Sequence, residues 1–357
     1  MELVSNQFAK HFQQYIASPY QDPLYCLGDA LHVLCELPDE SIDFVMTSPP
    51  YWAKREYLGG GIGLEDTAEA YIVNLLAIIK QIHRLLKPTG SFWLNIGDTY
   101  RNKHLLGIPW RLALTMMDEQ GWVLRNSVIW NKVKGAPDNS TDKLRNLHEH
   151  LFHFTKKAQG YYYDVDAIRS NPRQSRIVNG TIISATGVSG VRYKRQIELS
   201  TALTDEQKRK AATALDEMLE KMRNGEIADF RMIIRDQQRT THSSSVKVSG
   251  RARELAEKGF YFLAYHPEGS KPGDVWEIIP EDTQKRKFHF APYPEDLCKI
   301  PILSTCPEEG IALDPFCGTG TTTYVARILG RKSVGIDLSE EYLYYALQRS
   351  NLLVGIR

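Results

Sequence analysis

The sequence offers little that would support an extracellular, membrane-bound or metal-binding protein. Its five cysteines are odd in number and form no Cys-x-x-Cys pair, so we expect neither a disulfide framework nor a thiolate metal site. No apolar run reaches membrane-spanning length, because Lys80 and His83 interrupt the longest candidate. The first residues lack the charged leader and apolar core of a secretion signal. These absences predict a reduced, cytoplasmic protein.

The chain also lacks an overall excess of charge, since its formal net charge is +1, so any nucleic-acid surface must be a local patch. Residues 165–258 hold such an excess, with 18 Lys or Arg against 12 Asp or Glu. A run of this kind is most often a solvated face, but arginines among small hydroxyl residues also suit phosphates and base edges. The candidate nucleic-acid-binding residues there are Arg231, Arg235, Arg239, Lys247 and Arg251.

What the chain does contain is an alternation of strand and helix patterns at both ends, which predicts an α/β fold with a mostly parallel, doubly wound sheet. The expected strands are 24–27, 42–46, 91–96, 125–130, 147–154 (nearer a sheet edge), 311–313 and 333–336, and the chain returns to globular core at 274–279. The expected helices are 30–37, 67–86 (ended by residues 87–90), 109–120, 205–223, 295–304, 322–329 and 339–352. The change in composition near Asp164 divides the chain into residues 1–164, an insert at 165–270, and residues 271–357.

The turn Thr47-Ser48-Pro49-Pro50-Tyr51-Trp52 is the first candidate for chemistry. It follows an apolar strand, and two consecutive prolines force the chain to leave the sheet there. Because open α/β sheets bind ligands at the carboxyl ends of their strands, the turn delivers a hydroxyl, a carbonyl and aromatic rings to a crevice. A rigid corner that merely ends the strand is the alternative. The nearby Gly59–Gly63 loop is either a lid over this crevice or an ordinary surface loop.

The second candidate is the turn Asp314-Pro315-Phe316-Cys317-Gly318-Thr319-Gly320-Thr321, which lies between a strand and a helix. The next strand ends at Asp337, 23 positions after Asp314, close to the spacing of about 20 between turn and ribose-binding acid in dinucleotide folds. No Gly-Lys-Ser/Thr follows and the third glycine is missing, which favours a nucleoside without a pyrophosphate. Two strands cannot form a stable sheet alone, so this late unit must join the strands of the amino-terminal part.

Together the two motifs resemble those of the β-class DNA amino-methyltransferases, bacterial enzymes of restriction-modification systems. In that family the Pro-Pro-Tyr motif comes first, a target-recognition domain second and the S-adenosylmethionine loop last. The resemblance implies a Rossmann-like methyltransferase sheet with circularly permuted motif order and an inserted target-recognition domain at 165–270. It also implies S-adenosyl-L-methionine as cofactor, no metal, and double-stranded DNA as partner. A cognate restriction endonuclease acting on the same site, a monomer or homodimer, and a nucleoid-associated location are implied as well.

By this resemblance, Ser48, Pro49, Pro50 and Tyr51 are catalytic, with Tyr51 stacked on a flipped base and Ser48 and the Pro49 carbonyl bonded to its amine. Ser48 is similar to the form common among cytosine-N4 enzymes, whereas adenine-N6 relatives more often carry Asp or Asn there. Methylation of the ring carbon is disfavoured, because the sequence has no Pro-Cys pair. A methyltransferase acting on RNA, protein or a small molecule stays a less favoured alternative.

The cofactor-binding residues implied by the resemblance come from four places in the chain. Asp337 would hold the ribose, Asp29 would meet the adenine amine and Pro292 would close the methionine end. For Asp29, capping of the following helix is nearly as good an interpretation. The turn itself would supply Asp314, Phe316, Cys317, Gly318, Gly320 and Thr321.

Overall fold

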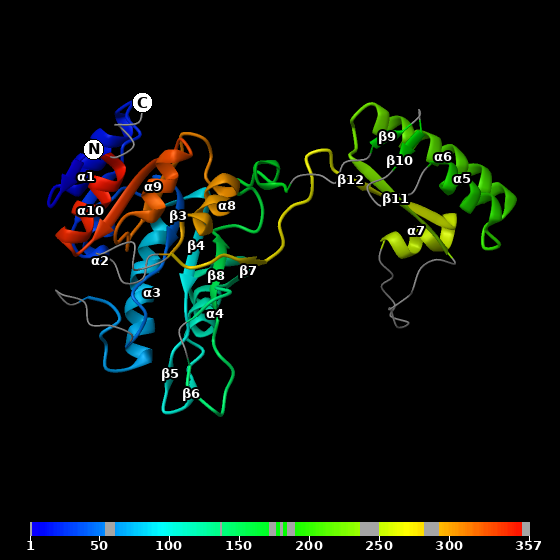
Figure 1. Ribbon diagram of the computed structural model, residues 1–357. Helices are drawn as coiled ribbons and strands as arrows, with labels where there is room; N and C mark the ends of the chain where they lie inside the picture. The colour runs from blue at the N-terminus through cyan, green and yellow to red at the C-terminus, as the bar shows by residue number, and fades with distance from the viewer. Residues whose placement is uncertain are drawn as a thin grey trace. The chain divides into compact units, whose positions relative to one another are not determined.

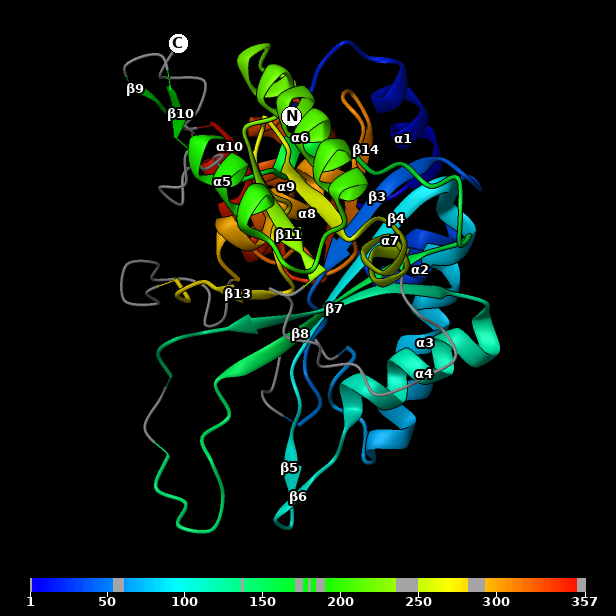
Figure 2. The same cartoon turned by 90° about the vertical axis from the view of Figure 1, so that its right-hand side faces the viewer.

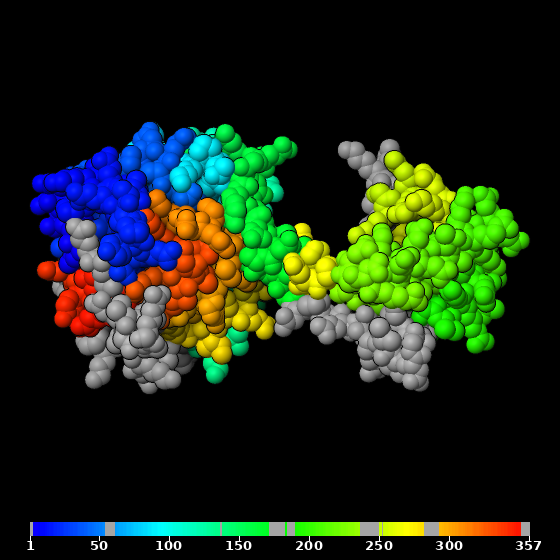
Figure 3. Space-filling view, turned by 90° about the horizontal axis from the view of Figure 1, so that it is seen from above, coloured from blue at the N-terminus to red at the C-terminus, as the bar shows by residue number. Residues whose placement is uncertain are grey.

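The computed structural model describes residues 2–53, 61–135, 138–170, 176–178, 181–183, 190–235, 250–281 and 293–351 (Figure 1). The chain divides into two compact units, residues 1–167 together with 273–357, and residues 168–272. The larger unit is thus built from both ends of the chain, and the smaller one from the middle. At the surface of the larger unit, amino-terminal (blue) and carboxyl-terminal (red) residues lie side by side (Figure 3).

A nine-stranded sheet forms the centre of the larger unit, in the order β1-β2-β15-β14-β3-β4-β8-β7-β13. Neighbouring strands are parallel except that β8 runs antiparallel to both β4 and β7. The strands are β1 (Glu2–Val4), β2 (Leu24–Leu27), β3 (Ile42–Thr47), β4 (Leu86–Ile96), β7 (Val123–Asn131), β8 (His148–Thr155), β13 (Val275–Glu277), β14 (Ile311–Asp314) and β15 (Lys332–Asp337). The mostly parallel α/β fold predicted from the sequence is confirmed.

The last two strands of the chain lie near the middle of this sheet. β14 pairs with β3 on one side and with β15 on the other, and β15 pairs in turn with β2. The prediction that the late strand–turn–helix–strand unit joins the amino-terminal strands is therefore confirmed. Its physical basis is that the backbone groups of a lone strand pair must find further partners.

Helices cover both faces of the sheet, as in a doubly wound fold (Figures 1 and 2). Successive strand residues point to opposite faces, so Val45 packs in one core while Phe44 and Met46 pack in the other. The first core is shared with α1 (Phe8–Ala17), α2 (Ala30–Glu36), α3 (Ala68–Leu85) and α4 (Ile108–Gln120). The opposite face packs against α8 (Glu295–Thr305), α9 (Thr321–Ile328) and α10 (Glu340–Asn351).

Two expectations about the sheet were wrong. β4 begins directly after α3 at Leu86, although the Lys-Pro-Thr-Gly segment 87–90 suggests a break before Ser91. A register shift between the pairs of Ile42 and Phe44 with β4 accommodates this segment. β8 is hydrogen-bonded on both sides, so its polar alternation does not mark an edge. One of its polar residues, His153, is buried because its ring stacks on Trp93 at 4.3 Å.

The smaller unit folds around a core of its own. Its elements are β9 (Arg176–Val178), β10 (Thr181–Ile183), α5 (Gly190–Leu199), α6 (Asp205–Arg223), β11 (Asp229–Ile234), α7 (Gly250–Lys258) and β12 (Phe260–Tyr265). Helix α6 has the bounds predicted from the sequence, and Thr204 and Gln207 form a capping box at its start. Apolar residues of α5, α6, β11 and β12 pack together in its core.

Two further features complete the description. A short hairpin, β5 (Tyr100–Arg101) and β6 (His104–Leu105), follows β4 and projects from the end of the sheet in both ribbon views. Across the described residues, no helix combines the length and hydropathy that crossing a lipid bilayer requires.

Candidate active site

The two candidate motifs lie at the same edge of the sheet. β3 and β14 are parallel neighbours, with Val45 opposite Leu313. At their carboxyl ends, the Thr47 hydroxyl donates a hydrogen bond of 2.6 Å to Asp314 Oδ1. The proline corner at 48–51 and the glycine turn at 315–320 therefore leave the sheet side by side. This edge is the position at which open α/β sheets bind ligands.

Asp314 fixes the start of the glycine turn. It is fully buried, and burial raises the pKa of its carboxyl. Besides the bond from Thr47, its carboxylate accepts bonds from the hydroxyls of Thr322 (2.6 Å) and Tyr293 (3.0 Å) and from the Phe316 N–H (3.1 Å). These four bonds hold the start of the turn in place, so Asp314 would affect cofactor binding only through the shape of the turn.

The glycine turn needs its glycines for backbone conformation and space. Gly318 and Gly320 both have positive φ, 50° and 74°. A Cβ on Gly320 would lie only 2.8 Å from the Tyr25 hydroxyl and 2.9 Å from Ala346 Cβ. Cys317 is buried in a small cluster with Tyr25, so its side chain belongs to the core and only its backbone follows the turn.

Two further predicted residues of the turn differ in exposure. Phe316 is partly buried against the main core and is not fully covered. Thr321 begins α9, and its buried hydroxyl accepts a bond of 3.1 Å from Arg349. The turn therefore presents backbone and one partly exposed aromatic residue at the edge.

Asp337 lies at the carboxyl end of β15 and is tied to the same turn. Its Oδ2 accepts a bond of 2.9 Å from the Gly318 N–H, and its Oδ1 accepts one of 2.8 Å from the Ser339 N–H. Burial raises the pKa of this carboxyl to about 6. Each oxygen retains a lone pair, so the carboxylate can accept further bonds from a ligand.

Asp29 lies one strand further along, at the end of β2. Gly28, just before it, donates its N–H to the Asp337 carbonyl at 3.0 Å, which places Asp29 at the same edge. Its Oδ1 accepts a bond of 3.0 Å from the His32 N–H and so caps α2. The capping interpretation is therefore confirmed, and contact with an adenine amine stays a prediction.

Hydrogen bonds from two aromatic side chains fix the backbone around the proline corner. The Tyr71 hydroxyl on α3 donates a bond of 2.9 Å to the Pro50 carbonyl. Trp52 is buried, and its indole N–H donates to the Glu65 carbonyl at 2.8 Å. Pro49 is buried, whereas Ser48 and Tyr51 are partly exposed. The corner thus places two partly exposed residues, Ser48 and Tyr51, on a fixed backbone.

Three residues that sequence reasoning missed complete the corner: Asn95 of β4, Glu149 of β8 and Lys132 after β7. The Tyr51 hydroxyl donates to Glu149 Oε2 at 2.7 Å, and Asn95 Nδ2 lies 2.9 Å from the same oxygen. Asn95 Nδ2 also lies 3.0 Å from the Tyr51 hydroxyl and 3.2 Å from Ser48 Oγ. Lys132 pairs with the other oxygen of Glu149.

Burial and the Glu149 charge together raise the pKa of Tyr51 well above its usual range, so this phenol stays protonated. The only hint in the sequence was Asn95, a polar residue in an otherwise apolar strand, because Glu149 lies among the alternating polar residues of β8. That hint did not identify partners, because strand pairing decides which residues meet.

Several predicted residues fall outside the described part of the chain: Gly59, Gly60, Arg239, Lys247 and Pro292. The end of the glycine-rich loop is described and contacts the corner. The Gly63 carbonyl accepts a bond of 3.0 Å from the Ala53 N–H, and a Cβ on Gly63 would lie 3.3 Å from Pro50. Whether this loop covers a substrate stays a prediction.

The described arginines of the insert differ from one another. Arg231 of β11 and Arg251 of α7 are exposed. Arg235 is exposed as well, but its guanidinium donates to the carbonyls of Leu255 (3.3 Å) and Ala256 (2.7 Å) in the last turn of α7. Cations stabilise helix carboxyl ends, so Arg235 has a structural role that its place in a basic run did not reveal.

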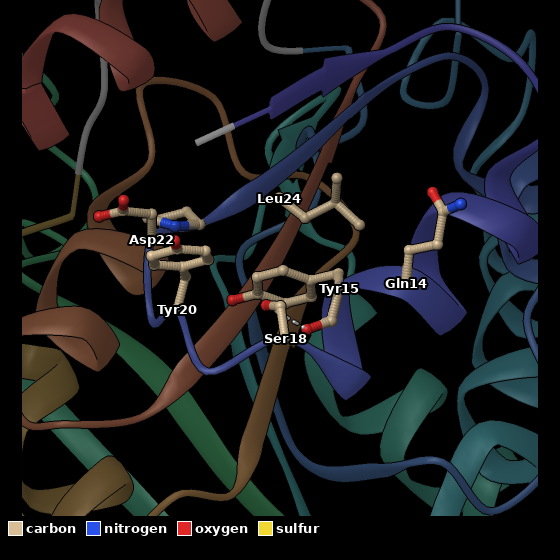
Figure 4. Close-up of a pocket in the computed structure, with 7 residues that line it drawn as sticks. Gln14, Tyr15, Ser18, Tyr20, Asp22 and Leu24 are labelled. Atoms are coloured by element: carbon tan, nitrogen blue, oxygen red, sulfur yellow. Dashed lines mark hydrogen bonds between the residues drawn. The ribbon is translucent and has the colours of Figure 1, made fainter.

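A separate cavity of about 230 Å³ lies where α1 connects to β2 (Figure 4). It reaches the first residue of β2, Leu24, so it lies at the amino end of that strand, away from the edge just described. Its lining is formed by Gln14, Tyr15, Ser18, Tyr20, Asp22, Pro23 and Leu24. It shares no residue with the candidate site.

Comparison with known proteins places this arrangement among DNA methylases. The model of the DNA methylase family N6_N4_Mtase matches residues 42–348, which span both motifs and the insert. The type II methyltransferase M.SfiI of Streptomyces fimbriatus is 32% identical over 92% of this chain and 90% of its own length. The type II methyltransferase M.SmaI of Serratia marcescens is 28% identical over 90% of this chain and 89% of its own.

Solved structures show the same fold at low sequence identity. The cytosine-N4-specific PvuII DNA methyltransferase has a TM-score of 0.55 and 17% identity, covering 94% of this chain and 91% of its own. A Thermus thermophilus protein solved with S-adenosyl-L-methionine has a TM-score of 0.50 and 19% identity, covering 93% of each chain.

Proposed function

Because the chain belongs to the DNA methylase family N6_N4_Mtase, we propose that it methylates the exocyclic amine of a cytosine flipped out of duplex DNA at a specific site. That it is a type II DNA methyltransferase dependent on S-adenosylmethionine follows from the family and from M.SfiI. The choice of cytosine N4 and the roles of individual residues are the proposal. The main support for the residue roles is that the two motifs lie side by side, since the Thr47–Asp314 bond joins the ends of β3 and β14.

The residues present at the glycine turn fit an S-adenosylmethionine nucleoside. Gly318 and Gly320, both with positive φ, leave the backbone uncovered at two positions of the turn, and Phe316 is a partly exposed aromatic residue. Asp337 is oriented by two backbone N–H groups and would hold the ribose hydroxyls. Asp29 and Pro292 would contact the adenine and methionine ends. When bound, the cofactor supplies a methyl group on a sulfonium, a good leaving group.

The corner residues would bind and orient the target base. An amine inside a duplex is inaccessible, so the nucleotide must be flipped out at a cost of a few kcal/mol. The ring of Tyr51, a partly exposed residue, would stack on the base, a contact worth about 1–3 kcal/mol. Ser48 Oγ and the Pro49 carbonyl would hydrogen-bond the amine and align its nitrogen for attack, while Pro50 keeps the corner rigid.

The choice of cytosine over adenine rests on Ser48, which occupies the position where adenine-specific relatives more often carry Asp or Asn. Adenine-N6 methylation is the alternative. The insert, residues 165–270 by sequence, would read the target through exposed cations such as Arg231 and Arg251. Arg239 and Lys247 belong to the same basic run. A cognate restriction endonuclease recognising the same site would be the functional partner.

Transfer of tritiated methyl groups from S-adenosylmethionine to duplex DNA, RNA or protein tests the proposal. Digestion of the methylated DNA and mass spectrometry of the nucleosides separates N4-methylcytosine from N6-methyladenine. We expect label in duplex DNA and N4-methylcytosine as its product. N6-methyladenine would overturn the choice of base, and label in RNA or protein alone would overturn DNA as the substrate.

A further inference from the structure

Glu149 places a carboxylate beside the proline corner from a strand that runs the opposite way. β8 is antiparallel to β4, so its first residues lie where β4 ends, with His150 opposite Ile96. The Glu149 side chain is only 12% exposed. Its Oε2 accepts a bond of 2.7 Å from the Tyr51 hydroxyl, and its Oε1 pairs with Lys132. A charged group this buried is matched with partners on both of its oxygens.

The contacts of Glu149 fix the direction of the hydrogen bond that Tyr51 makes. The Lys132 ammonium pairs with Glu149 Oε1, and a carboxylate held in such an ion pair only accepts hydrogen bonds. The single phenolic proton of Tyr51 must therefore point to Glu149. The Tyr51 oxygen is left as an acceptor toward its other neighbours, Asn95 Nδ2 at 3.0 Å and Ser48 Oγ at 3.3 Å.

The direction of the Tyr51 hydrogen bond also determines whether the Ser48 hydroxyl donates or accepts. Because Tyr51 has no second proton, the contact between the two hydroxyls has Ser48 donating and Tyr51 accepting. Asn95 Nδ2 also lies 3.2 Å from Ser48 Oγ, and its two protons are shared among Glu149, Tyr51 and Ser48, since turning this amide round would set its oxygen against the Glu149 carboxylate. Ser48 Oγ has then used its proton and at most one lone pair. Its second lone pair remains, and the side chain is partly exposed.

We propose that Glu149 is a positioning residue that sets this direction, so that Ser48 Oγ meets the target base as an acceptor and selects bases with an exocyclic amine. The inference rests on the proposed function and deepens it. An amine offers N–H donors to such an oxygen, whereas the keto group of uracil or hypoxanthine offers only an acceptor. Two acceptors facing each other leave both unsatisfied, which a buried site tolerates poorly.

Gly97, just past the end of β4, leaves space for this hydrogen-bond network. A Cβ at this position would lie 2.8 Å from Tyr51 Cε2 and 3.3 Å from Glu149 Cγ. The ring and the carboxylate therefore both rest against a position that only glycine leaves open. The close approach of Tyr51 and Glu149 is a consequence of the backbone at this point.

Glu149→Gln tests the inference, because the amide has nearly the same shape but can donate. The Lys132 ammonium attracts the amide oxygen, so the amide N–H group would face Tyr51 and reverse the direction of both hydroxyls. We expect the rate of single-turnover methyl transfer to duplex DNA to fall about 10- to 100-fold. Glu149→Asp, shorter but still an acceptor, should keep more activity than Glu149→Gln. A purely structural role predicts the reverse order, since Gln matches the shape better.

Base selection is the second readout. Duplexes carrying the methylated site, once sequencing has located it, are compared with duplexes whose target base is replaced by its keto counterpart, uracil or hypoxanthine. We expect wild-type protein to bind the amine-bearing duplex more tightly and Glu149→Gln to reduce that preference about tenfold. A Tyr51→Phe background removes the hydroxyl between Glu149 and Ser48 and leaves only the Asn95 amide linking them. Glu149→Gln should therefore have a much smaller effect on the rate in that background.

Glu40→Gln is the matched control, because Glu40 also pairs with a lysine, Lys156 at 3.5 Å, and takes no part in the corner. It should keep the wild-type rate and base preference. Equal rates for wild-type protein and Glu149→Gln, or an undiminished base preference, would overturn the inference alone. Wild-type protein that fails to methylate DNA would instead overturn the proposed function, and this inference with it.

Discussion

Thr47 and Asp314 stand 267 positions apart in the sequence, and the hydroxyl of the first donates a hydrogen bond of 2.6 Å to the carboxylate of the second. Each residue is the last of its strand, β3 or β14, and the two strands are neighbours. The bond therefore joins the proline corner and the glycine turn directly. It also explains how motifs from opposite ends of the chain are held in register.

Replacing Thr47 by valine should weaken the larger unit without changing its shape. The change removes one donor to a buried carboxylate that keeps three others, so we expect a loss of about 1–3 kcal/mol in the free energy of unfolding. Thr213→Val, on the exposed face of α6, should change stability by less than about 0.5 kcal/mol. Thermal denaturation compares the two, and equal effects would show that the bond contributes nothing particular.

Cofactor affinity should depend on pH through Asp337. Burial raises its pKa to about 6, so this carboxyl takes up a proton as the pH falls through 6 and can then no longer accept both ribose hydroxyls. We expect the dissociation constant of S-adenosylmethionine to rise up to about tenfold per pH unit below 6 and to level off above it. Isothermal titration calorimetry from pH 5 to 8 measures this.

Asp337→Asn supplies the control for that titration. It should bind the cofactor weakly at every pH and show no break near pH 6, because the amide does not titrate. The same shift has a consequence for stability. Folding raises the pKa of this carboxyl from about 4 to about 6. Between these two pH values the unfolded chain has already lost the proton that the folded protein keeps, so the free energy of unfolding falls as the pH rises from about 4 to about 6. A wild-type affinity that does not change between pH 5 and 8 would contradict the role given to Asp337.

Much of this fold was predictable because its signals are local. The predicted helix at residues 205–223 and the strand–glycine turn–helix–strand pattern of residues 311–337 are elements that the structure contains. The permuted sheet followed from an argument about pairing, since β14 and β15 had to find neighbours. Element type and order thus depended on short stretches of sequence and on the need to satisfy backbone hydrogen bonds.

The rest depended on pairing that short stretches do not encode. Glu149 reaches the corner because β8 runs antiparallel between β4 and β7, and nothing in its own segment gives that direction. Asn95 was visible only as a polar residue in an apolar strand. β4 began earlier than expected because a register shift absorbs the Lys-Pro-Thr-Gly segment that looked like a stop. In each of these cases tertiary contacts, and not the local sequence signal, determined the structure.

Ser48→Ala should separate binding from transfer. The variant loses the hydroxyl proposed to contact the amine, while every residue of the glycine turn is unchanged. We expect the S-adenosylmethionine dissociation constant to stay within about twofold of wild type and methyl transfer to fall about 100-fold or more. Calorimetry and a tritium-transfer assay provide the two numbers. Full activity in Ser48→Ala would refute the role assigned to the hydroxyl.

Two arginines of the insert should behave differently when replaced by alanine. Arg231 is exposed and, under the proposed function, contacts a phosphate or base, so Arg231→Ala should weaken DNA binding and lower the salt slope by about one. Arg235 donates to two carbonyls of α7, so Arg235→Ala should mainly lower the stability of the smaller unit. Filter binding at several salt concentrations and thermal denaturation distinguish them. Identical effects of the two changes would contradict this division.

Gly320 and Gly330 form a matched pair for testing how tightly the glycine turn is packed. Both adopt nearly the same left-handed backbone, with φ of 74° and 76°, so alanine meets the same conformational strain of about 1–2 kcal/mol at either position. They differ in their surroundings. A Cβ on Gly320 would lie 2.8 Å from the Tyr25 hydroxyl, whereas one on Gly330 meets no atom of the described residues within 4 Å.

Gly320→Ala should therefore cost about 1–3 kcal/mol more stability than Gly330→Ala, because Tyr25 and Ala346 must move to admit the methyl group. Only the change at Gly320 displaces the turn that Asp337 holds, so only that variant should also lose S-adenosylmethionine affinity. Thermal denaturation and calorimetry of both variants measure the two effects. Equal stability and equal cofactor affinity of the two variants would show that the turn tolerates a side chain at position 320. Close approach of the backbone to the cofactor would then not explain why glycine occupies this position.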